Sequence, residues 1–304
     1  MRTALKLGAS VAIGAAFAVP LLRRRVKVPA AASLAAVAAA PLALAVLRPR
    51  TRARDALVFA LQMWGFAIAH ELPYDDPDAL RRRLKVRYPI AVDRALGFGE
   101  LPNVRLQRAF SVPGQVTKRD RFLSFVHWAW FLQPHAALLW ILLRDEERFP
   151  RAARQMAGVY DLGCLVYFLV PTAPPWWAGE NGELGSEVRR VMVEVGEDVW
   201  GPAWTPLYEA LGGNPWAAMP SLHFATSLQA ALLLSESGRI PGALGWSYAT
   251  CLGFALVYLC EHYVVDLVAG ATLVAGVRRG ERSAEPAALA LSRAVQRLER
   301  MAND

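Results

Sequence analysis

Runs of apolar residues, separated by short polar stretches, recur along the entire chain of 304 residues. An α-helix that crosses a bilayer needs about 20 predominantly apolar residues, and several of these runs approach that length. Together they predict an all-α integral membrane protein that folds as a multi-helix bundle. The predicted spans are 5–22, 28–47, 55–72, 122–143, 153–172, 220–236, 241–260 and 263–277.

The composition agrees with this fold class. Hydrophobic residues make up 55% of the chain and the mean hydropathy is +0.24, which is high for a soluble domain. The first two predicted spans are rich in alanine and carry no recognisable chemistry. We therefore expect them to pack on the outside of the bundle.

The positive charge of the chain fits a membrane surface better than a nucleic acid. The formal net charge is +8, but the arginines gather directly beside apolar runs, at 48–54 and 278–282. Such clusters are typical of the cytoplasmic flanks of membrane helices. We therefore expect a membrane partner and no nucleic acid, with the tail after residue 277 in the cytoplasm. A further basic cluster at 23–27 would then lie outside, which leaves the N-terminal topology open.

Three polar side chains lie inside predicted spans or at their ends, where burying them is costly. They are His223, His262 and Asp266. Ionisable groups at such positions are functional candidates by default, although a histidine that only hydrogen-bonds a neighbouring helix is the common alternative. Alternation of the spans brings His223 and His262 to one membrane face. That convergence favours catalysis, with the site on the extracytoplasmic side.

The types and spacing of these residues suit phosphoryl transfer. His262 and Asp266 are four residues apart and share a helix face, so the carboxylate can hold one ring nitrogen and leave the other as a nucleophile. His223 can then protonate the leaving oxygen. Ser221 lies at the predicted start of the helix that carries His223, where free N–H groups favour an anion. A phosphate group bound between the two histidines would give each of these residues a role.

Two connecting segments complete the expected organisation. Leu80, Leu84 and Tyr88 recur at helical spacing among basic residues, which predicts a helix in the membrane interface. The stretch 173–219 is rich in proline, glycine and tryptophan and is predicted to be irregular. Because so long a loop usually has a function, we expect it to cover the site.

Three short stretches of the chain together resemble the type-2 phosphatidate phosphatase superfamily. They are 171–177 (PTAPPWW), 219–223 (MPSLH) and 262–266 (HYVVD). Within that superfamily they look most like the inositol phosphorylceramide synthase branch, with a fainter likeness to sphingomyelin synthase. The stretch 93–99 (DRALGFG), followed by Leu106 and Gln107, is also similar to that branch. The resemblance covers about 90–277, and the motifs are specific in combination and weak singly.

The resemblance implies a fold and a set of roles. It implies a six-helix core with the two N-terminal helices added. It makes His262 the nucleophile, Asp266 its partner and His223 the acid on the leaving group, with no metal and no cofactor. The chain has no Cys/His cluster with zinc spacing either.

The chain departs from the superfamily pattern in two places. The phosphatases usually carry a lysine–arginine–proline motif, for which there is no clean match here. They also carry an arginine six residues before the nucleophile, where this chain has Leu256. The inositol phosphorylceramide synthase branch lacks both features. The phosphate-binding cations are thus unassigned; Lys118 and Arg119 are candidates from their expected side of the membrane, and His127 is expected to line the site.

These observations lead to one functional expectation and two alternatives. We expect a multi-pass enzyme of the cell membrane, a lipid phosphotransferase similar to inositol phosphorylceramide synthase, acting on a phospholipid through a phosphohistidine. The alternatives are a lipid phosphate phosphatase, in which water is the acceptor, and a non-catalytic transporter or scaffold. The lipid headgroup, the acceptor and the oligomeric state stay open. The expected domains are N-terminal membrane helices at 1–50, a catalytic membrane domain at 51–277 and a basic cytoplasmic tail helix at 278–304.

Overall fold

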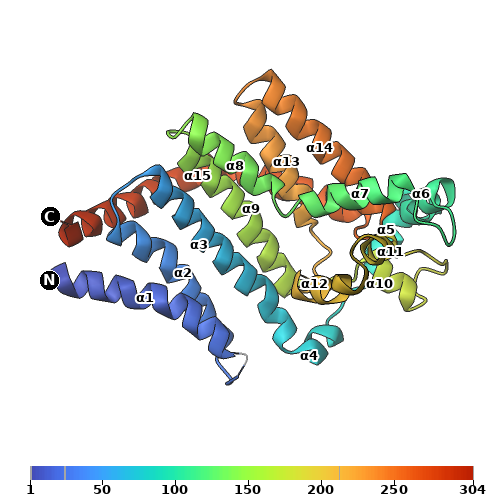
Figure 1. The fold of residues 1–304 in the computed structure, drawn as a ribbon, viewed down its shortest axis with the longest axis horizontal. Helices are drawn as coiled ribbons and strands as arrows, with labels where there is room; N and C mark the ends of the chain where they lie inside the picture. Colours follow the sequence, from blue (N-terminus) through green and yellow to red (C-terminus); the bar gives the residue numbers. More distant parts are fainter. Residues whose placement is uncertain (1, 24, 212, 304) are drawn as a thin grey trace. The chain divides into compact units, whose positions relative to one another are not determined.

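The computed structural model describes residues 2–23, 25–211 and 213–303, and within these ranges the protein is built from helices (Figure 1). The all-α membrane fold class expected from the sequence is therefore confirmed. The chain forms two compact units. Unit 1 consists of Met1–Leu72, Leu138–Gly158 and Gly276–Asp304, and unit 2 of Pro73–Ala137 and Val159–Ala275.

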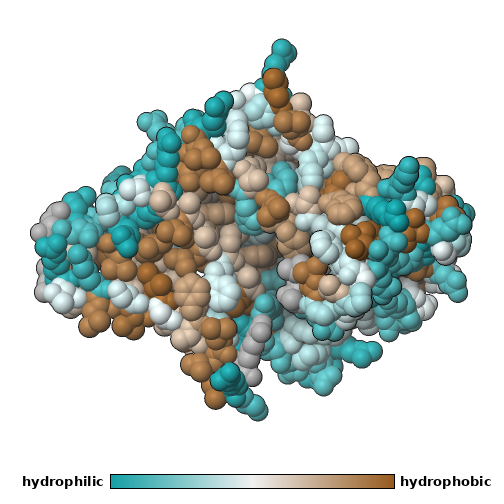
Figure 2. All heavy atoms as spheres, in the orientation of Figure 1, coloured by the Kyte–Doolittle hydropathy of each residue, from teal (hydrophilic) through white to brown (hydrophobic). Residues whose placement is uncertain are grey.

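Unit 1 begins with three helices that are long and apolar enough to cross a membrane. These are α1 (Arg2–Arg23), α2 (Ala30–Leu47) and α3 (Arg52–Glu71). Each helix packs along the next in the chain, and apolar atoms cover much of the face that they present in Figure 2. An apolar surface of this kind is stable only in contact with lipid or protein, which agrees with membrane-spanning helices.

Charged side chains tie together the ends of the helices in unit 1. The guanidinium of Arg2 donates to the carbonyl of Ala302 at 3.0 Å, and Arg54 pairs with Glu299 at 3.5 Å. At the other end of α1, Arg23 pairs with Glu71 at 2.9 Å. This pair neutralises one cation of the 23–27 cluster, whose position disagreed with the expected charge bias.

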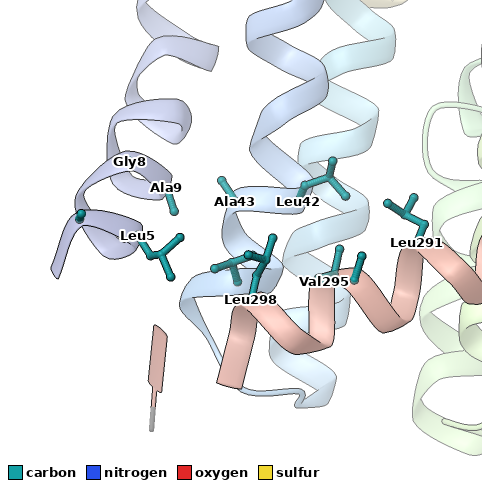
Figure 3. A pocket seen from close by; sticks show the side chains of 11 residues that line it. Leu5, Gly8, Ala9, Leu42, Ala43, Leu291, Val295 and Leu298 are labelled. Atoms are coloured by element: carbon teal, nitrogen blue, oxygen red, sulfur yellow. The ribbon is translucent and has the colours of Figure 1, made fainter. Parts of the chain in front are cut away.

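Unit 1 also contains an apolar cavity of about 370 Å³ between α1, α2 and the C-terminal part of α15 (Figure 3). None of its lining side chains is polar, so it offers no group for acid–base or nucleophilic chemistry. The lining residues are Ala4, Leu5, Gly8, Ala9, Leu42, Ala43, Val46, Leu291, Ala294, Val295 and Leu298.

The remaining long helices correspond to the other predicted spans. They are α7 (Lys118–Ala129), α8 (Gln133–Arg144), α9 (Phe149–Leu169), α13 (Leu222–Ser235), α14 (Arg239–Tyr258) and α15 (Val264–Asn303). By length and composition, α14 is a fourth candidate span among the described residues, in addition to α1, α2 and α3. The bent pair of α7 and α8 is a fifth if the two helices count as one span. Residues 264–303 form one continuous helix, which includes the predicted tail.

Two predicted spans differ from their expected form. The run 122–143 is not one straight helix, because α7 and α8 meet at a bend of 51°. Pro134 lies in the first turn of α8, where a proline fits, but it could not continue α7 without losing a backbone hydrogen bond. The run 220–236 is reduced to the 14 residues of α13, because its first residues form a non-helical segment that ends at the cap, Ser221.

Small residues allow the helices of unit 2 to approach closely. A side chain on Gly245 of α14 would lie 2.8 Å from the backbone of Ala231 on α13. A side chain on Gly270 of α15 would lie 2.8 Å from the carbonyl oxygen of Ser221. Close packing through small residues is the usual way that membrane helices associate. At Gly270 it brings the start of α15 against the start of α13.

The connecting segments of unit 2 are more ordered than expected. The predicted interface helix is interrupted at Lys85, whose N–H donates to the carbonyl of Pro171 at 2.8 Å and whose carbonyl accepts from the N–H of Ala173 at 3.0 Å. Among the described residues, the predicted loop 173–219 contains three short α-helices and one 3-10 helix. The elements in these segments are η1 (Leu72–Asp75), α4 (Pro77–Arg82), α5 (Arg87–Leu96), α6 (Pro102–Phe110), α10 (Pro175–Glu180), α11 (Val191–Trp200), η2 (Gly201–Ala203) and α12 (Trp204–Leu211).

Candidate active site

The turn between α14 and α15 delivers His262 to the interior of unit 2. Helix α14 ends at Tyr258, and Cys260 adopts the left-handed conformation (φ 61°) that commonly ends a helix. The backbone N–H of Trp176 donates to the carbonyl of Cys260 at 3.0 Å. The left-handed backbone conformation is costly for a residue other than glycine. The hydrogen bond from Trp176, in the 173–219 segment, therefore stabilises the turn beside His262.

Two buried side chains hold this turn from the other side. The amide of Asn103 donates to the carbonyls of Val257 and His262 at 2.8 and 3.0 Å. The carboxylate of Asp93 accepts from the backbone N–H groups of Val264 and Val265 at 2.8 and 2.9 Å. Asp93 therefore caps the start of α15, where a negative charge is favoured.

Burial raises the pKa of the Asp93 carboxyl, and its two backbone hydrogen bonds act in the opposite direction. The side chain is completely inaccessible to solvent. A buried carboxylate with two N–H donors is the arrangement that keeps such a group satisfied. Asp93 and Asn103 thus determine the position of His262, although neither touches the imidazole.

Asp266 contacts the His262 ring as the spacing of four residues predicted. Its Oδ2 atom lies 3.4 Å from Nδ1 of His262 and accepts from the backbone N–H of Tyr263 at 2.9 Å. The first distance is longer than a typical hydrogen bond, and catalytic contacts often shorten when substrate binds. With Asp266 accepting from Nδ1–H, the lone pair of His262 is on Nε2.

His223 faces that lone pair. It is the second residue of α13, whose cap is the hydroxyl of Ser221, which accepts from the N–H of Phe224 at 3.2 Å. The Nδ1 atom of His223 lies 3.1 Å from Nε2 of His262. One of these nitrogens must donate, and the tautomer set by Asp266 assigns the proton to His223. A proton donor and a nucleophilic lone pair therefore meet at one point.

Two further rings enclose the imidazole of His223. His127, in the last turn of α7, stacks on it with centroids 4.8 Å apart and planes at 30°. Trp130, in the bend that follows α7, lies at 4.2 Å with planes at 47°. His127 is buried, and neither of its ring nitrogens has a hydrogen-bond partner among the described residues. The sequence indicated His127 but not Trp130.

The side of the site that holds His262 is closed to solvent, whereas His223 is half-buried. His262 is 4% exposed and Asp266 is completely buried. Electrostatic interactions in such a place are stronger than in water. Next to His262 in the chain, burial raises the pKa of Glu261 to about 7, while the charges of Arg190 and His262 lower it.

Arg190 is the cation whose charge acts on Glu261, the residue before His262. Its guanidinium stacks over the ring of Trp176 at 3.9 Å, donates to the hydroxyl of Tyr208 at 2.9 Å and pairs with Glu180 at 3.2 Å. Its Nε atom is buried and has no hydrogen-bond partner in the ranges that the structure describes. The sequence contained no signal for Arg190, because its role depends on how the 173–219 segment folds.

The structure brings together only some of the residues that the sequence indicated. His223, His262, Asp266 and His127 form one cluster, with Ser221 at the start of its helix. Lys118 and Arg119 are exposed at the start of α7. The guanidinium of Arg119 contacts the carbonyl and the ring of Phe110. In the described part of the chain, neither cation has a recorded contact with the histidines.

No group of three or more His, Cys, Asp or Glu side chains within the described residues is arranged to hold a metal ion. The cluster itself contains three imidazoles, two of which face each other through ring nitrogens 3.1 Å apart.

A family model described as the PAP2 superfamily matches residues 90–278. The matched segment includes all members of the histidine cluster, together with Asp93, Asn103 and Arg190. No curated protein and no solved structure matches the chain.

Proposed function

Because the chain belongs to the PAP2 superfamily of type-2 phosphatidic acid phosphatases, we propose that it transfers a phosphoryl group from a phospholipid through a phosphohistidine on His262. Membership supports a membrane enzyme that acts on lipid phosphates as a phosphatase or a phosphotransferase. One observation carries the proposed mechanism: the 3.1 Å contact between His223 and His262, with Asp266 on the far side of the His262 ring.

The first half of the reaction forms the covalent intermediate. The phosphate group of the phospholipid enters between the two rings and separates them. Nε2 of His262 then attacks phosphorus, and the bond from phosphorus to the glycerol oxygen breaks. His223, as an imidazolium, gives its proton to that oxygen, and diacylglycerol leaves. Asp266 stabilises the positive charge that develops on His262. The start of α13, capped by Ser221, favours the phosphate anion by its dipole.

The second half of the reaction transfers the group to an acceptor. An acceptor hydroxyl attacks phosphorus, neutral His223 takes its proton, and the bond from phosphorus to Nε2 of His262 breaks. The enzyme returns to its starting protonation state. If the acceptor is water the product is a free phosphate ester, and if it is a lipid hydroxyl the product is a new phospholipid.

We propose that the acceptor is a hydroxyl-bearing lipid, as in the inositol phosphorylceramide synthase branch that the chain resembles. The support from the site is its burial, since His262 is only 4% exposed. Exclusion of water protects a reactive intermediate from hydrolysis. His127, with its two unpartnered nitrogens beside His223, is available to bind the acceptor hydroxyl. Arg190, whose charge acts on Glu261 beside His262, is the candidate cation for the headgroup.

This choice predicts the products of a single assay. Purified protein in mixed micelles with phosphatidylinositol and radiolabelled ceramide should produce labelled inositol phosphorylceramide and diacylglycerol in equal amounts. A reaction without ceramide measures hydrolysis, which should be slower by at least about tenfold if the site excludes water. Release of inositol phosphate at the same rate with and without ceramide would reject the transferase and leave a hydrolase, in which water is the acceptor.

The side of the membrane is part of the proposal. The basic runs at 48–54 and 278–282 place those segments in the cytoplasm by the positive-inside bias, and alternation of the spans then places His223 and His262 on the extracytoplasmic face. Right-side-out vesicles should therefore convert a membrane-impermeant short-chain substrate without added detergent. Conversion only after permeabilisation, or only in inverted vesicles, would place the site on the cytoplasmic face.

A further inference from the structure

We infer that Trp130 is a positioning residue that keeps His223 protonated, and so extends the reaction to higher pH. The inference rests on the proposed function, because it assigns Trp130 to the acid of that reaction. The sequence offers no signal for this role, since Trp130 lies outside every motif quoted above.

Trp130 is the cap residue at the end of α7, and its backbone is still helical (φ −57°, ψ −34°). Its indole lies against α13, with its centroid 4.2 Å from that of the His223 ring. His127, three residues earlier on the same face of α7, stacks on that ring as well. The end of α7 therefore brings two rings to His223.

The indole is anchored to the helix that carries His223. Its Nε1–H donates to the hydroxyl of Thr226 at 2.8 Å, and that hydroxyl donates to the carbonyl of Leu222 at 2.7 Å. Thr226 is completely buried and lies one turn after His223 on α13. The ring of Trp130 thus has one polar group, and that group is satisfied. Its π face is free to act on the imidazole.

An aromatic face within about 6 Å of a cation attracts it, and indole does so most strongly. The effect is larger where the pair is shielded from water, and His223 and Trp130 are both half-buried. Trp130 therefore favours the imidazolium form of His223 over the neutral form. A tryptophan that served only to fill space would pack equally well against either form.

Other groups also face the pair of histidines. His127 of α7 stacks on the His223 ring, and Nε2 of His262 lies against its Nδ1 atom. Asp266 of α15 contacts His262, and Glu261 interacts with His262 through its charge. From α9, Tyr167 donates to the carbonyl of Pro220 at 2.8 Å and Tyr160 bonds Thr226. The phenols are neutral, and a second imidazolium would repel the first.

The pH profile of kcat/KM separates this role from a structural one. The nucleophile must be neutral, which sets the acid limb, and the acid must be protonated, which sets the alkaline limb. Because the two ring nitrogens are 3.1 Å apart, the two limbs are coupled. Trp130→Leu should move the alkaline limb to lower pH by about half a unit and the acid limb by less. Trp130→Phe, which keeps a weaker π face, should move the alkaline limb less.

The controls distinguish failure of this inference from failure of the proposed function. Leu132→Ala changes an exposed residue of the same turn (73% exposed) and should leave both limbs unchanged. His223→Asn should remove the alkaline limb. If it does not, His223 is not the acid and the proposed function is wrong at that step. If it does, but the limb stays fixed in Trp130→Leu and Trp130→Phe or both limbs move equally, then only the role of Trp130 is rejected. Should Trp130→Leu fail to fold, the phenylalanine variant decides alone, with a shift toward lower pH required.

Discussion

Replacing His262 with alanine is expected to lower phospholipid turnover by at least about 10⁵-fold, since loss of a covalent nucleophile removes nearly the whole catalytic effect. The backbone carbonyl of His262, which accepts from Asn103 at 3.0 Å, remains in the variant. The turn between α14 and α15 should therefore keep its position. The measurement is diacylglycerol release in detergent micelles, together with trapping of radiolabelled phosphorus on the protein after an acid-free quench.

The matched control for this variant is His70→Ala. His70 lies on α3, outside the residues 90–278 that the family model covers, so the variant should retain parental turnover and labelling. Elution of both variants as the parent protein does on size exclusion shows that folding is intact. Parental turnover or parental labelling in His262→Ala would remove His262 as the nucleophile, and with it the phosphohistidine.

The second large effect is expected for Asp266→Asn, which should lower kcat by about 10³- to 10⁴-fold with little change in KM. The amide keeps the shape of the side chain and can still accept from the N–H of Tyr263. It no longer fixes the proton on Nδ1 of His262, and it cannot stabilise the imidazolium that forms when Nε2 attacks phosphorus. The loss is incomplete because the nucleophile itself is still present.

Its control is Asp198→Asn, which removes a carboxylate from a surface ion pair with Arg121. Exposed pairs of this kind contribute little, so activity should stay within about twofold of the parent. Measuring kcat and KM separately tests the assignment further. A rise in KM at unchanged kcat would mean that Asp266 binds substrate and does not orient the nucleophile.

Local sequence patterns were sufficient for the helices and for the central residues of the site. The run of apolar residues that ends at Tyr258 and resumes at Val264 predicts two helices and a break between them. It also places His262 at that break and Asp266 one turn later. Both features depend on hydrophobicity and on the period of the helix, which are properties of neighbouring residues. The family resemblance used the same short stretches.

Local patterns failed where the chain bends or bonds a distant segment. The stretch 122–143 has the composition of one span, and hydrophobicity alone does not show that it breaks near Trp130. Likewise, Asp93 lies 171 residues from Val264, and nothing in its surroundings indicates that it caps α15. Lys118 and Arg119 were proposed from the expected side of the membrane. The side of the membrane on which a residue lies gives its depth, but it does not show which residues are its neighbours.

The sequence by itself determined that this protein is a bundle of apolar helices with two histidines and a carboxylate at their ends, because burial of polar groups in membrane helices is costly enough to be informative wherever it occurs. Only the tertiary structure decided which rings meet. The contact of His223 with His262, and the contacts of His127 and Trp130 with His223, depend on close approach at Gly270 and on the packing of the end of α7 against α13. Such contacts join residues far apart in the chain, and packing in three dimensions selects them.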